Sequence, residues 1–409
     1  MKVLVFTSLY PNNIWPNHGV FIKERMTRFA RLDECEVKII APVPYFPALK
    51  INWRWQFSQV ARCELRDGIE VYHPRYFLTP KVGMVFYGWM MLLSVLSTVK
   101  KVQKDFKFDL IDAHFVYPDG FAAVLLGWLF RKPVVVSARG SDINLYAKFP
   151  LIRSLLQFTL RRADKVISVC LALKDAMVEL GVPAEKINVV PNGVDVQKFY
   201  RLHKEAARKA LGMPEDARII ISVGNLIPRK GFDLLIRAIK ILRGNLGVEN
   251  LCLIIVGEGP FRKELESLIS VLKLKDTVRL AGAVLHHDLY LWYSAADLSC
   301  LTSSREGWPN VLLESLACGT PVVAANTWGV PEIITSDQIG LLTERNEEAI
   351  ADTLLCALRK QWQTENLLEY ANNHTWDRTA LAVLRVFRAL VNEGNVLTDN
   401  FSTGRVMKT

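Results

Sequence analysis

The segment from Arg305 to Pro321, REGWPNVLLESLACGTP, holds the side chains of this sequence that are most informative about chemistry. Pro309 and Asn310 suit the start of a short helix, and Gly319 suits the position just after its end. The free backbone N–H groups of about residues 311–313 would then bind phosphate oxygens at a helix N-terminus. The pattern therefore predicts an anion site that needs no metal ion.

Two carboxylates accompany this anion site. Glu306 lies in the loop before the expected helix, and Glu314 lies on it, in an E-x7-E spacing. Carboxylates beside a phosphate would repel it unless they face hydroxyl groups instead. A sugar and a ribose supply such hydroxyls, so the segment favours a sugar nucleotide as the ligand.

Adjacent cations follow another apolar run. Arg229 and Lys230 lie in the loop after residues 219–223, close to Gly224. Such a pair can clamp a diphosphate, each charge-assisted contact contributing about 1.5–3 kcal/mol when it is shielded from water. The alternative is a solvated pair that caps a loop. Gly257 and Gly259 form a third loop, suited to close backbone approach by a flat base.

The elements that position these loops are short β-branched runs that alternate with helical stretches. This order predicts parallel sheets covered by helices on both faces. Ligands then collect at the carboxyl ends of the strands. The expected strands are 3–6, 37–41, 69–72, 110–113, 134–137, 166–169, 187–190, 219–223, 251–256, 278–281, 298–301 and 322–325.

Composition excludes several classes of protein. The 409 residues are 50% hydrophobic and 22% charged, which is typical of a large globular chain. Its formal charge of +10 favours anionic partners, but no basic stripe interleaved with aromatic residues supports nucleic acid. The seven cysteines are scattered and form no CxxC, which fits a reducing cytoplasm. No complete dinucleotide, Walker or zinc-protease motif occurs.

Taken together, these motifs resemble the retaining family 4 glycosyltransferases of GT-B fold, over most of the chain. Glu306 and Glu314 match the family's E-x7-E pattern, and the PNGVD of residues 191–195 matches its linker. Gly19, after the first strand, matches its glycine loop, and His114 matches its active-site histidine. The resemblance implies an α/β fold in which two Rossmann-like, doubly wound, parallel-sheet domains face each other across a cleft.

The resemblance also implies roles for these residues. The first domain (1–197, completed by a C-terminal helix at 376–395) would bind the acceptor, and the second (198–375) a nucleotide-diphosphate sugar. Residues 396–409 would form a disordered tail. The expected catalytic residues are His114, Glu306, Arg229 and Lys230. His114 could hydrogen-bond the donor sugar, and the alternative is a histidine that belongs to the core. The expected donor-binding residues are Gly19, Gly224, Arg229, Lys230, Gly257, Gly259, Asn310, Val311, Leu312 and Glu314, with no metal and no cofactor.

Three positions depart from the family pattern. Arg139 stands where the family often has histidine, in Arg-Gly-Ser-Asp, so Arg139 and Asp142 are expected on the acceptor side. Asn225 stands where arginine is common, and Trp328 where a second glycine is frequent. The departures leave the diphosphate clamp intact but weaken any inference about which sugar fits.

Residues 82–99 are uncharged and mostly apolar, and lysines follow at 100, 101 and 104. Three interpretations are open: a helix buried in a domain, a helix on a membrane surface, or a membrane span, for which about 20 such residues are needed. We expect a cytoplasmic protein that can reach the inner face of the membrane, with Met90, Met91 and Leu92 as the inserting residues.

The sequence thus predicts a metal-independent, retaining hexosyltransferase that acts on a lipid-linked or polysaccharide precursor in cell-surface glycan synthesis. A GT-B-fold sugar-nucleotide epimerase would share the donor site but form no product joined to an acceptor. The chain could also be a non-catalytic sugar-nucleotide sensor or a membrane scaffold. Loss of glycosyl transfer in Glu306→Ala, or in Arg229→Ala with Lys230→Ala, would argue against that alternative. Nucleotide base, sugar, acceptor and linkage are not specified by these motifs.

Overall fold

The computed structural model describes residues 1–50, 53–78, 83–244, 248 and 250–402. It divides the chain into one unit of residues up to Pro191 plus those from Trp376 onward, and a second unit from Asn192 to Thr375. The boundary was expected after residue 197, but it lies after Pro191. The reason is that the backbone N–H of Val194 donates to the His374 carbonyl, 2.9 Å away, which joins the linker to the second unit.

The first unit is built on an eight-stranded sheet with the order β10-β9-β8-β7-β1-β2-β5-β4. All neighbouring strands are parallel except β4 and β5, which form an antiparallel pair. A small parallel pair, β3 (Val43–Pro44) and β6 (Arg75–Tyr76), lies apart from this sheet. The strands of the main sheet are β1 (Lys2–Phe6), β2 (Glu36–Ile40), β4 (Cys63–Arg66), β5 (Ile69–Tyr72), β7 (Leu110–His114), β8 (Val134–Ala138), β9 (Lys165–Ser168) and β10 (Ile187–Val189).

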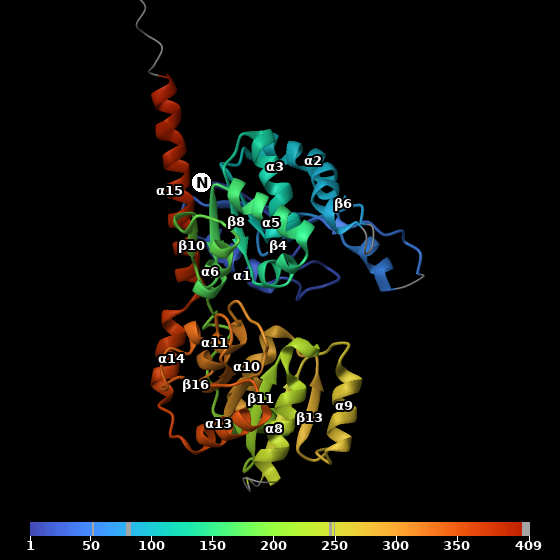
Figure 1. Ribbon diagram of the computed structural model, residues 1–409, viewed down its shortest axis with the longest axis vertical. Coiled ribbons are helices and arrows are strands. Elements are labelled where there is room, and N and C mark those ends of the chain that lie inside the picture. The colour runs from blue at the N-terminus through green and yellow to red at the C-terminus, as the bar shows by residue number, and fades with distance from the viewer. Residues whose placement is uncertain (51–52, 79–82, 245–247, 249, 403–409) are drawn as a thin grey trace, which may run out of the picture. The chain divides into compact units, whose positions relative to one another are not determined.

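Helices α1 (Val20–Phe29) and α15 (Trp376–Ser402) share the apolar core on one face of this sheet (Figure 1). The rings of Phe29 and Phe387 meet edge to face at 5.4 Å. Helix α3 (Phe121–Phe130) packs on β7 and β8 and contacts α2 (Tyr87–Phe106) and α5 (Pro150–Arg162). Residues 396–402 of the expected disordered tail are helical, and residues 403–409 lie outside the described part of the chain.

The second unit has a six-stranded, fully parallel sheet with the order β13-β12-β11-β14-β15-β16. Helices α8 (Phe232–Gly244), α9 (Arg262–Val271) and α13 (Glu347–Arg359) share one apolar core with it. In a second group, α7 (Lys204–Leu211) packs on α10 (Leu289–Ala295), and α11 (Asn310–Ala317) on α14 (Thr364–Asn373). The strands are β11 (Arg218–Val223), β12 (Leu251–Val256), β13 (Val278–Gly282), β14 (Leu298–Leu301), β15 (Val322–Ala325) and β16 (Gly340–Thr343).

The two sheets confirm the expected doubly wound architecture, and every expected strand is present. In each sheet the order in which strands are added reverses beside the first strand. The reversal lies between β1 and β7 in the first unit, and between β11 and β14 in the second. Such switch points leave a crevice between the loops at the carboxyl ends of the strands, where ligands bind in folds of this kind.

The apolar segment at residues 82–99 forms a short turn, η2 (Met84–Phe86), and the first part of α2; Val82 lies outside the described residues. Residues 84–106 form one helical stretch that is long and apolar enough to cross a membrane by length and composition, and 28% of its apolar window is buried in the structure. Met91, one of the expected inserting residues, is fully buried because it packs against the domain, whereas Met90 is exposed.

Candidate functional site

The loops after β11 and β14 bring Arg229, Lys230 and Glu306 together at the switch point of the second unit. Lys230 Nζ lies 2.6 Å from Glu306 Oε1, and Arg229 Nη1 lies 3.6 Å from Glu306 Oε2. Arg229 also donates to the backbone carbonyl of Arg305 at 2.5 Å. Two cations and one carboxylate thus leave an excess of positive charge at this edge, which suits a polyanionic ligand.

The carboxylate of Glu306 is largely enclosed, with 12% of its side chain exposed. Burial alone would raise its pKa, but the charges of Lys230 and Arg229 outweigh burial and hold the pKa below its usual value. Glu306 is therefore ionised at neutral pH and fixes the position of the Lys230 ammonium. The backbone of Glu306 is held in turn, because its carbonyl accepts from the N–H of Gly329 at 3.2 Å.

The loop before Gly329 contains one of the departures from the family pattern. Trp328 has a φ of 47°, in the left-handed region that favours glycine. The backbone at this position is one that a glycine adopts easily, although the residue here is a tryptophan.

Helix α11 starts at Asn310, as the sequence predicted. The side chain of Asn310 bridges the linker: its Oδ1 accepts from Asn192 at 3.0 Å, and its Nδ2 donates to the carbonyl of Gly193 at 3.2 Å. The N–H of Leu312 donates to the carbonyl of Pro309 at 3.1 Å, so it is not one of the free groups expected for phosphate. Asn310 thus anchors the helix start to the linker.

Glu314 lies on α11 with its carboxylate between two side chains. His286 Nε2 is 3.0 Å from Oε1, and the Tyr293 hydroxyl is 3.3 Å from Oε2. Phe199 packs edge to face on the His286 ring at 5.1 Å. His286 was not predicted from the sequence, because no motif joins it to a glutamate 28 residues further on. The neighbouring His287 remains largely in solvent, with 69% of its side chain exposed.

Gly257 and Gly259 are required by the packing of two loops against each other. An added Cβ would lie 2.0 Å from the Gly224 carbonyl oxygen at position 257, and 2.4 Å from that of Leu226 at position 259. Both glycines therefore admit the chain's own backbone, and the approach of a base to this loop stays a prediction. At Gly224, a Cβ would meet the side chain of Lys230, with Cε at 3.3 Å.

In the first unit, His114 and Arg139 meet at the ends of β7 and β8. Arg139 Nη2 lies 2.5 Å from His114 Nδ1. Because a guanidinium has only donors, Nδ1 accepts and the neutral ring carries its proton on Nε2, which lies 3.1 Å from Asp112 Oδ2. Asp112 in turn pairs with buried Arg25 at 3.1 Å. Nδ1 of the expected active-site histidine is therefore engaged by Arg139, whereas Nε2 lies near Asp112 without an aligned hydrogen bond.

The charges of this cluster are strongly perturbed. Burial lowers the pKa of His114, against the opposing charge of Asp112 and with the help of Arg139, to about 3. Burial also lowers the pKa of Arg139, to about 9, and the charge of Arg25 adds to the effect. His114 is thus neutral at physiological pH beside a buried positive charge.

Asp142 and Gly19 shape the loops around this cluster. The buried carboxylate of Asp142 accepts from the backbone N–H groups of Val116, Arg139 and Gly140, at 2.8–3.2 Å. Its oxygens therefore organise two loops, and the place of Asp142 on the acceptor side stays a prediction. Gly19 has a φ of 69°, and its Cβ would lie 2.2 Å from the Leu9 carbonyl oxygen, so only glycine fits there.

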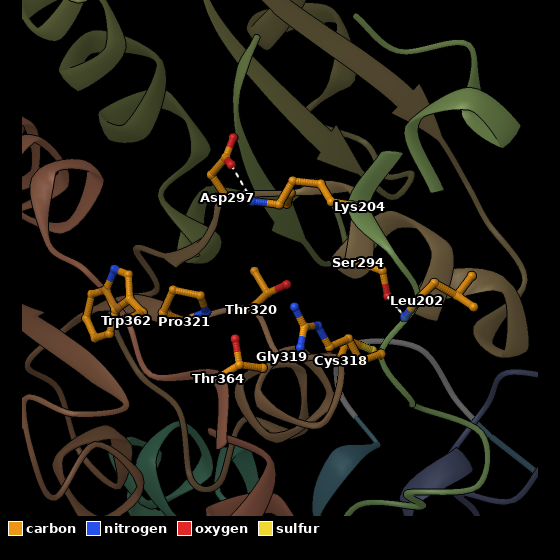
Figure 2. Close-up of a pocket in the computed structure, with 12 residues that line it drawn as sticks. Leu202, Lys204, Ser294, Asp297, Cys318, Gly319, Thr320, Pro321, Trp362 and Thr364 are labelled. Atoms are coloured by element: carbon orange, nitrogen blue, oxygen red, sulfur yellow. Dashed lines mark hydrogen bonds and ion pairs between the residues drawn. The ribbon is translucent and has the colours of Figure 1, made fainter. Parts of the chain in front are cut away.

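A separate cavity of about 230 Å³ lies at the opposite edge of the second sheet, where Asp297 precedes β14 and Pro321 precedes β15. Figure 2 shows Lys204 reaching Asp297, 2.6 Å away, and Ser294 meeting the backbone of Leu202. These contacts are satisfied within the protein, and the cavity lies away from the loops that carry Arg229 and Glu306. We therefore assign it no part in the candidate site.

Within the described residues, no group of three or more His, Cys, Asp and Glu side chains is arranged to hold a metal ion. At the switch point of the second unit, Arg229 and Lys230 both contact Glu306, and Arg345 Nε donates to the carbonyl of Thr302, just after β14, at 2.9 Å.

Family models match both halves of the chain. The model described as Glycosyltransferase Family 4 matches residues 20–198, and Glycosyl transferases group 1 matches residues 203–374. TuaC of Bacillus subtilis, named as a glycosyltransferase of teichuronic acid biosynthesis, is 31% identical over 380 residues, which cover 89% of this chain and 91% of TuaC. The N-acetyl-alpha-D-glucosaminyl L-malate synthase of Bacillus anthracis is 25% identical over 70% of this chain and 74% of its own.

Solved structures share the fold. Sucrose-phosphate synthase from Thermosynechococcus elongatus superposes with a TM-score of 0.77 at 18% identity, over 96% of this chain and 99% of its own. Anabaena Alr3699/HepE, solved in complex with UDP-glucose, gives a TM-score of 0.71 at 20% identity, over 95% of this chain and 100% of its own.

Proposed function

Because the chain belongs to glycosyltransferase family 4, with the GT-B fold, we propose that it moves a hexosyl group from a nucleotide-diphosphate sugar to an acceptor hydroxyl with retention of anomeric configuration and without a metal ion. The observation that carries the proposal is the cluster of Arg229, Lys230 and Glu306 at the switch point of the second unit. The acceptor is a lipid-linked or polysaccharide precursor of the cell surface, and the reaction takes place in the cytoplasm.

The positions of Arg229 and Lys230 suit the most difficult step of such a transfer, which is the departure of the diphosphate from the sugar. As the bond to the sugar breaks, negative charge grows on the departing diphosphate, and preorganised positive charge stabilises it. Lys230 is already held by Glu306, and Arg229 by the Arg305 carbonyl, so neither side chain must be ordered when the reaction occurs. In this proposal Glu306 accepts from sugar hydroxyls, and Glu314 from ribose hydroxyls.

Two of the proteins named above support the ligand class. Alr3699/HepE was solved with UDP-glucose, and TuaC is named for teichuronic acid biosynthesis. We carry these properties over as part of the proposal. His114 and Arg139 would serve the acceptor end of the reaction, once a ligand redirects one of the contacts that now occupy the ring.

The test is a thermal-shift screen of sugar nucleotides in the presence of EDTA, followed by a transfer assay with the donor that raises the melting temperature. We expect a shift and transfer without metal, and an unchanged anomeric configuration by proton NMR of the product. Arg229→Ala with Lys230→Ala should abolish both. The matched pair Arg237→Ala with Lys240→Ala, two cations on the surface of α8, should change neither.

Other outcomes would overturn the proposal. Free-sugar isomers as the sole product would identify an epimerase. A shift with no product, unchanged by Glu306→Ala, would identify a sugar-nucleotide sensor. Transfer that requires a divalent ion, or that inverts the anomeric carbon, would contradict the metal-independent, retaining reaction.

A further inference from the structure

Helix α2 presents an apolar surface to solvent over its first turns. Leu93 is 66% exposed, and Trp89 and Met90 are also exposed on this side, as is Phe86 just before the helix. The opposite side of α2 is fully buried at Met91, Val95 and Val99. Single exposed apolar residues are ordinary, but a contiguous group on one element marks an interaction surface.

Basic side chains continue the same helix. Lys100, Lys101 and Lys104 are exposed in its last turns. With a rise of 1.5 Å per residue, Lys100 lies about 10 Å beyond Leu93 along the helix axis. The one carboxylate of α2, Asp105, lies near Tyr72 of β5, where its charge acts on that hydroxyl.

A second element extends the surface at the start of α2. The turn η1 (Trp53–Gln59) carries Trp53, which is exposed, and Arg54, whose guanidinium lies 6.0 Å from the Trp53 ring centre. The charge of Arg54 acts on Tyr87, the first residue of α2. Apolar and aromatic side chains are thus flanked by cations at both ends.

This surface is fixed to the loop that follows His114. The hydroxyl of Tyr117 lies 2.6 Å from the carbonyl oxygen of Met84 and accepts from the N–H of Gly88 at 3.4 Å. On the other side, the ring of Trp15, in the loop after β1, packs on Phe57 of η1 at 4.7 Å. The apolar end of α2 therefore belongs to the carboxyl edge of the sheet, where His114 and Arg139 lie.

We propose that Phe86, Trp89, Met90, Leu93 and Trp53 form a docking surface for an anionic phospholipid bilayer. The apolar and aromatic side chains enter the boundary between headgroups and acyl chains, while the lysines of α2 and Arg54 contact the phosphate groups. The helix does not span the bilayer, because Met91, Val95 and Val99 would have to leave the core of the first unit.

Docking in this way turns the carboxyl edge of the first unit toward the bilayer. An acceptor held in the membrane by a lipid could then reach His114 and Arg139 without leaving its leaflet. This role in acceptor delivery rests on the proposed function, whereas docking itself does not.

The test is co-sedimentation of the full chain with vesicles of phosphatidylcholine alone or mixed equally with phosphatidylglycerol. We expect binding to the mixed vesicles, and at least tenfold weaker binding to phosphatidylcholine. Met90→Ser with Leu93→Ser should weaken binding at least tenfold, whereas Val271→Ser, at a 73% exposed position on α9, should leave it unchanged. Lys100→Gln with Lys104→Gln should weaken binding and its dependence on salt, and Lys209→Gln with Lys263→Gln should not.

Equal melting temperatures and equal donor-induced thermal shifts show that these variants fold and keep the donor site, so failure of docking is distinguished from failure of the proposed function. Equal binding of wild type and Met90→Ser/Leu93→Ser would overturn the proposal. So would a dimer in solution that the same pair of substitutions dissociates, because a second copy would then cover the surface.

Discussion

The ammonium of Lys230 lies 2.6 Å from the carboxylate of Glu306, although 76 residues separate them, and both side chains are largely buried. Removing one partner leaves the other charge poorly compensated, which is costly in a buried site. We expect Lys230→Ala and Glu306→Ala each to lower the free energy of unfolding by about 1–3 kcal/mol, and the double variant to lose less than the sum.

Measurements of activity distinguish this effect on stability from the proposed role of Lys230 in glycosyl transfer. Lys230→Ala and the double variant should both lower kcat by roughly 10²–10³, the usual effect of removing a group that stabilises transition-state charge. Chemical unfolding and steady-state kinetics measure the two effects. A double variant with restored stability and near-normal kcat would contradict a role for Lys230 in the reaction.

His286 is expected to position Glu314, since its Nε2 contacts Glu314 Oε1 at 3.0 Å. His286→Ala should raise KM for the donor about tenfold, which corresponds to one lost hydrogen bond to a charged group. His287→Ala is the matched control, because the adjacent ring is mostly in solvent, and it should leave KM unchanged. If the two variants behave alike, the contact with Glu314 has no part in donor binding.

Asp119 gives a pH-dependent prediction. Its buried carboxylate accepts from the N–H and hydroxyl of Ser8, and burial raises its pKa to about 7. Between about pH 4 and pH 7 the native state therefore binds more protons than the unfolded state, so this group lowers stability as pH rises through that range. Asp119→Asn should remove the effect, which amounts to at most about 4 kcal/mol.

The comparison between wild type and Asp119→Asn isolates this group from His114, which acts in the opposite direction. The pKa of His114 is lowered to about 3, so its contribution to stability is lost as pH falls below about 6.5. Melting temperatures at pH 5, 6, 7 and 8 measure the difference. We expect the melting temperature of Asp119→Asn to increase relative to that of wild type as pH rises. A difference in melting temperature that stays constant with pH would show that Asp119 does not titrate in this range.

Gly257 gives a prediction about packing. Its φ of 144° and the 2.0 Å approach of a Cβ to the Gly224 carbonyl oxygen leave no room for a side chain. Gly257→Ala should lower the free energy of unfolding by about 2–4 kcal/mol. Gly244→Ala, at a position on α8 with open space, should leave stability unchanged or raise it by up to about 1 kcal/mol. Urea denaturation followed by circular dichroism distinguishes them.

The strands were predictable where both faces are buried, because such strands are continuous apolar runs. All of β8 is buried, and its residues 134–137 were expected. β4, with the sequence CELR, was missed since it alternates in exposure at the sheet edge and contains polar residues. β16 was missed because Gly340 and Thr343 leave only two apolar residues between them.

The site was predictable in part, for a topological reason. Once β11 and β14 are neighbours, the loops that follow them must lie together, and so Arg229, Lys230 and Glu306 meet. The contact between His286 and Glu314 depends on how the start of α10 is placed, which no periodicity encodes. Sequence likewise cannot tell a glycine that admits a ligand from one, such as Gly257, that admits the chain's own backbone.

Helix α15 contributes Ala380, Val383 and Phe387 to an apolar core. Helix α1 contributes Ile22, Met26 and Phe29 to the same core. During synthesis, these partners of α1 leave the ribosome about 350 residues after it, when the entire second unit has already emerged. The growing chain must therefore keep this apolar surface from aggregating until translation is nearly complete, whereas Asn192 to Thr375 can fold earlier. A premature stop near residue 375 would leave the nascent first unit as a substrate for chaperones and proteases.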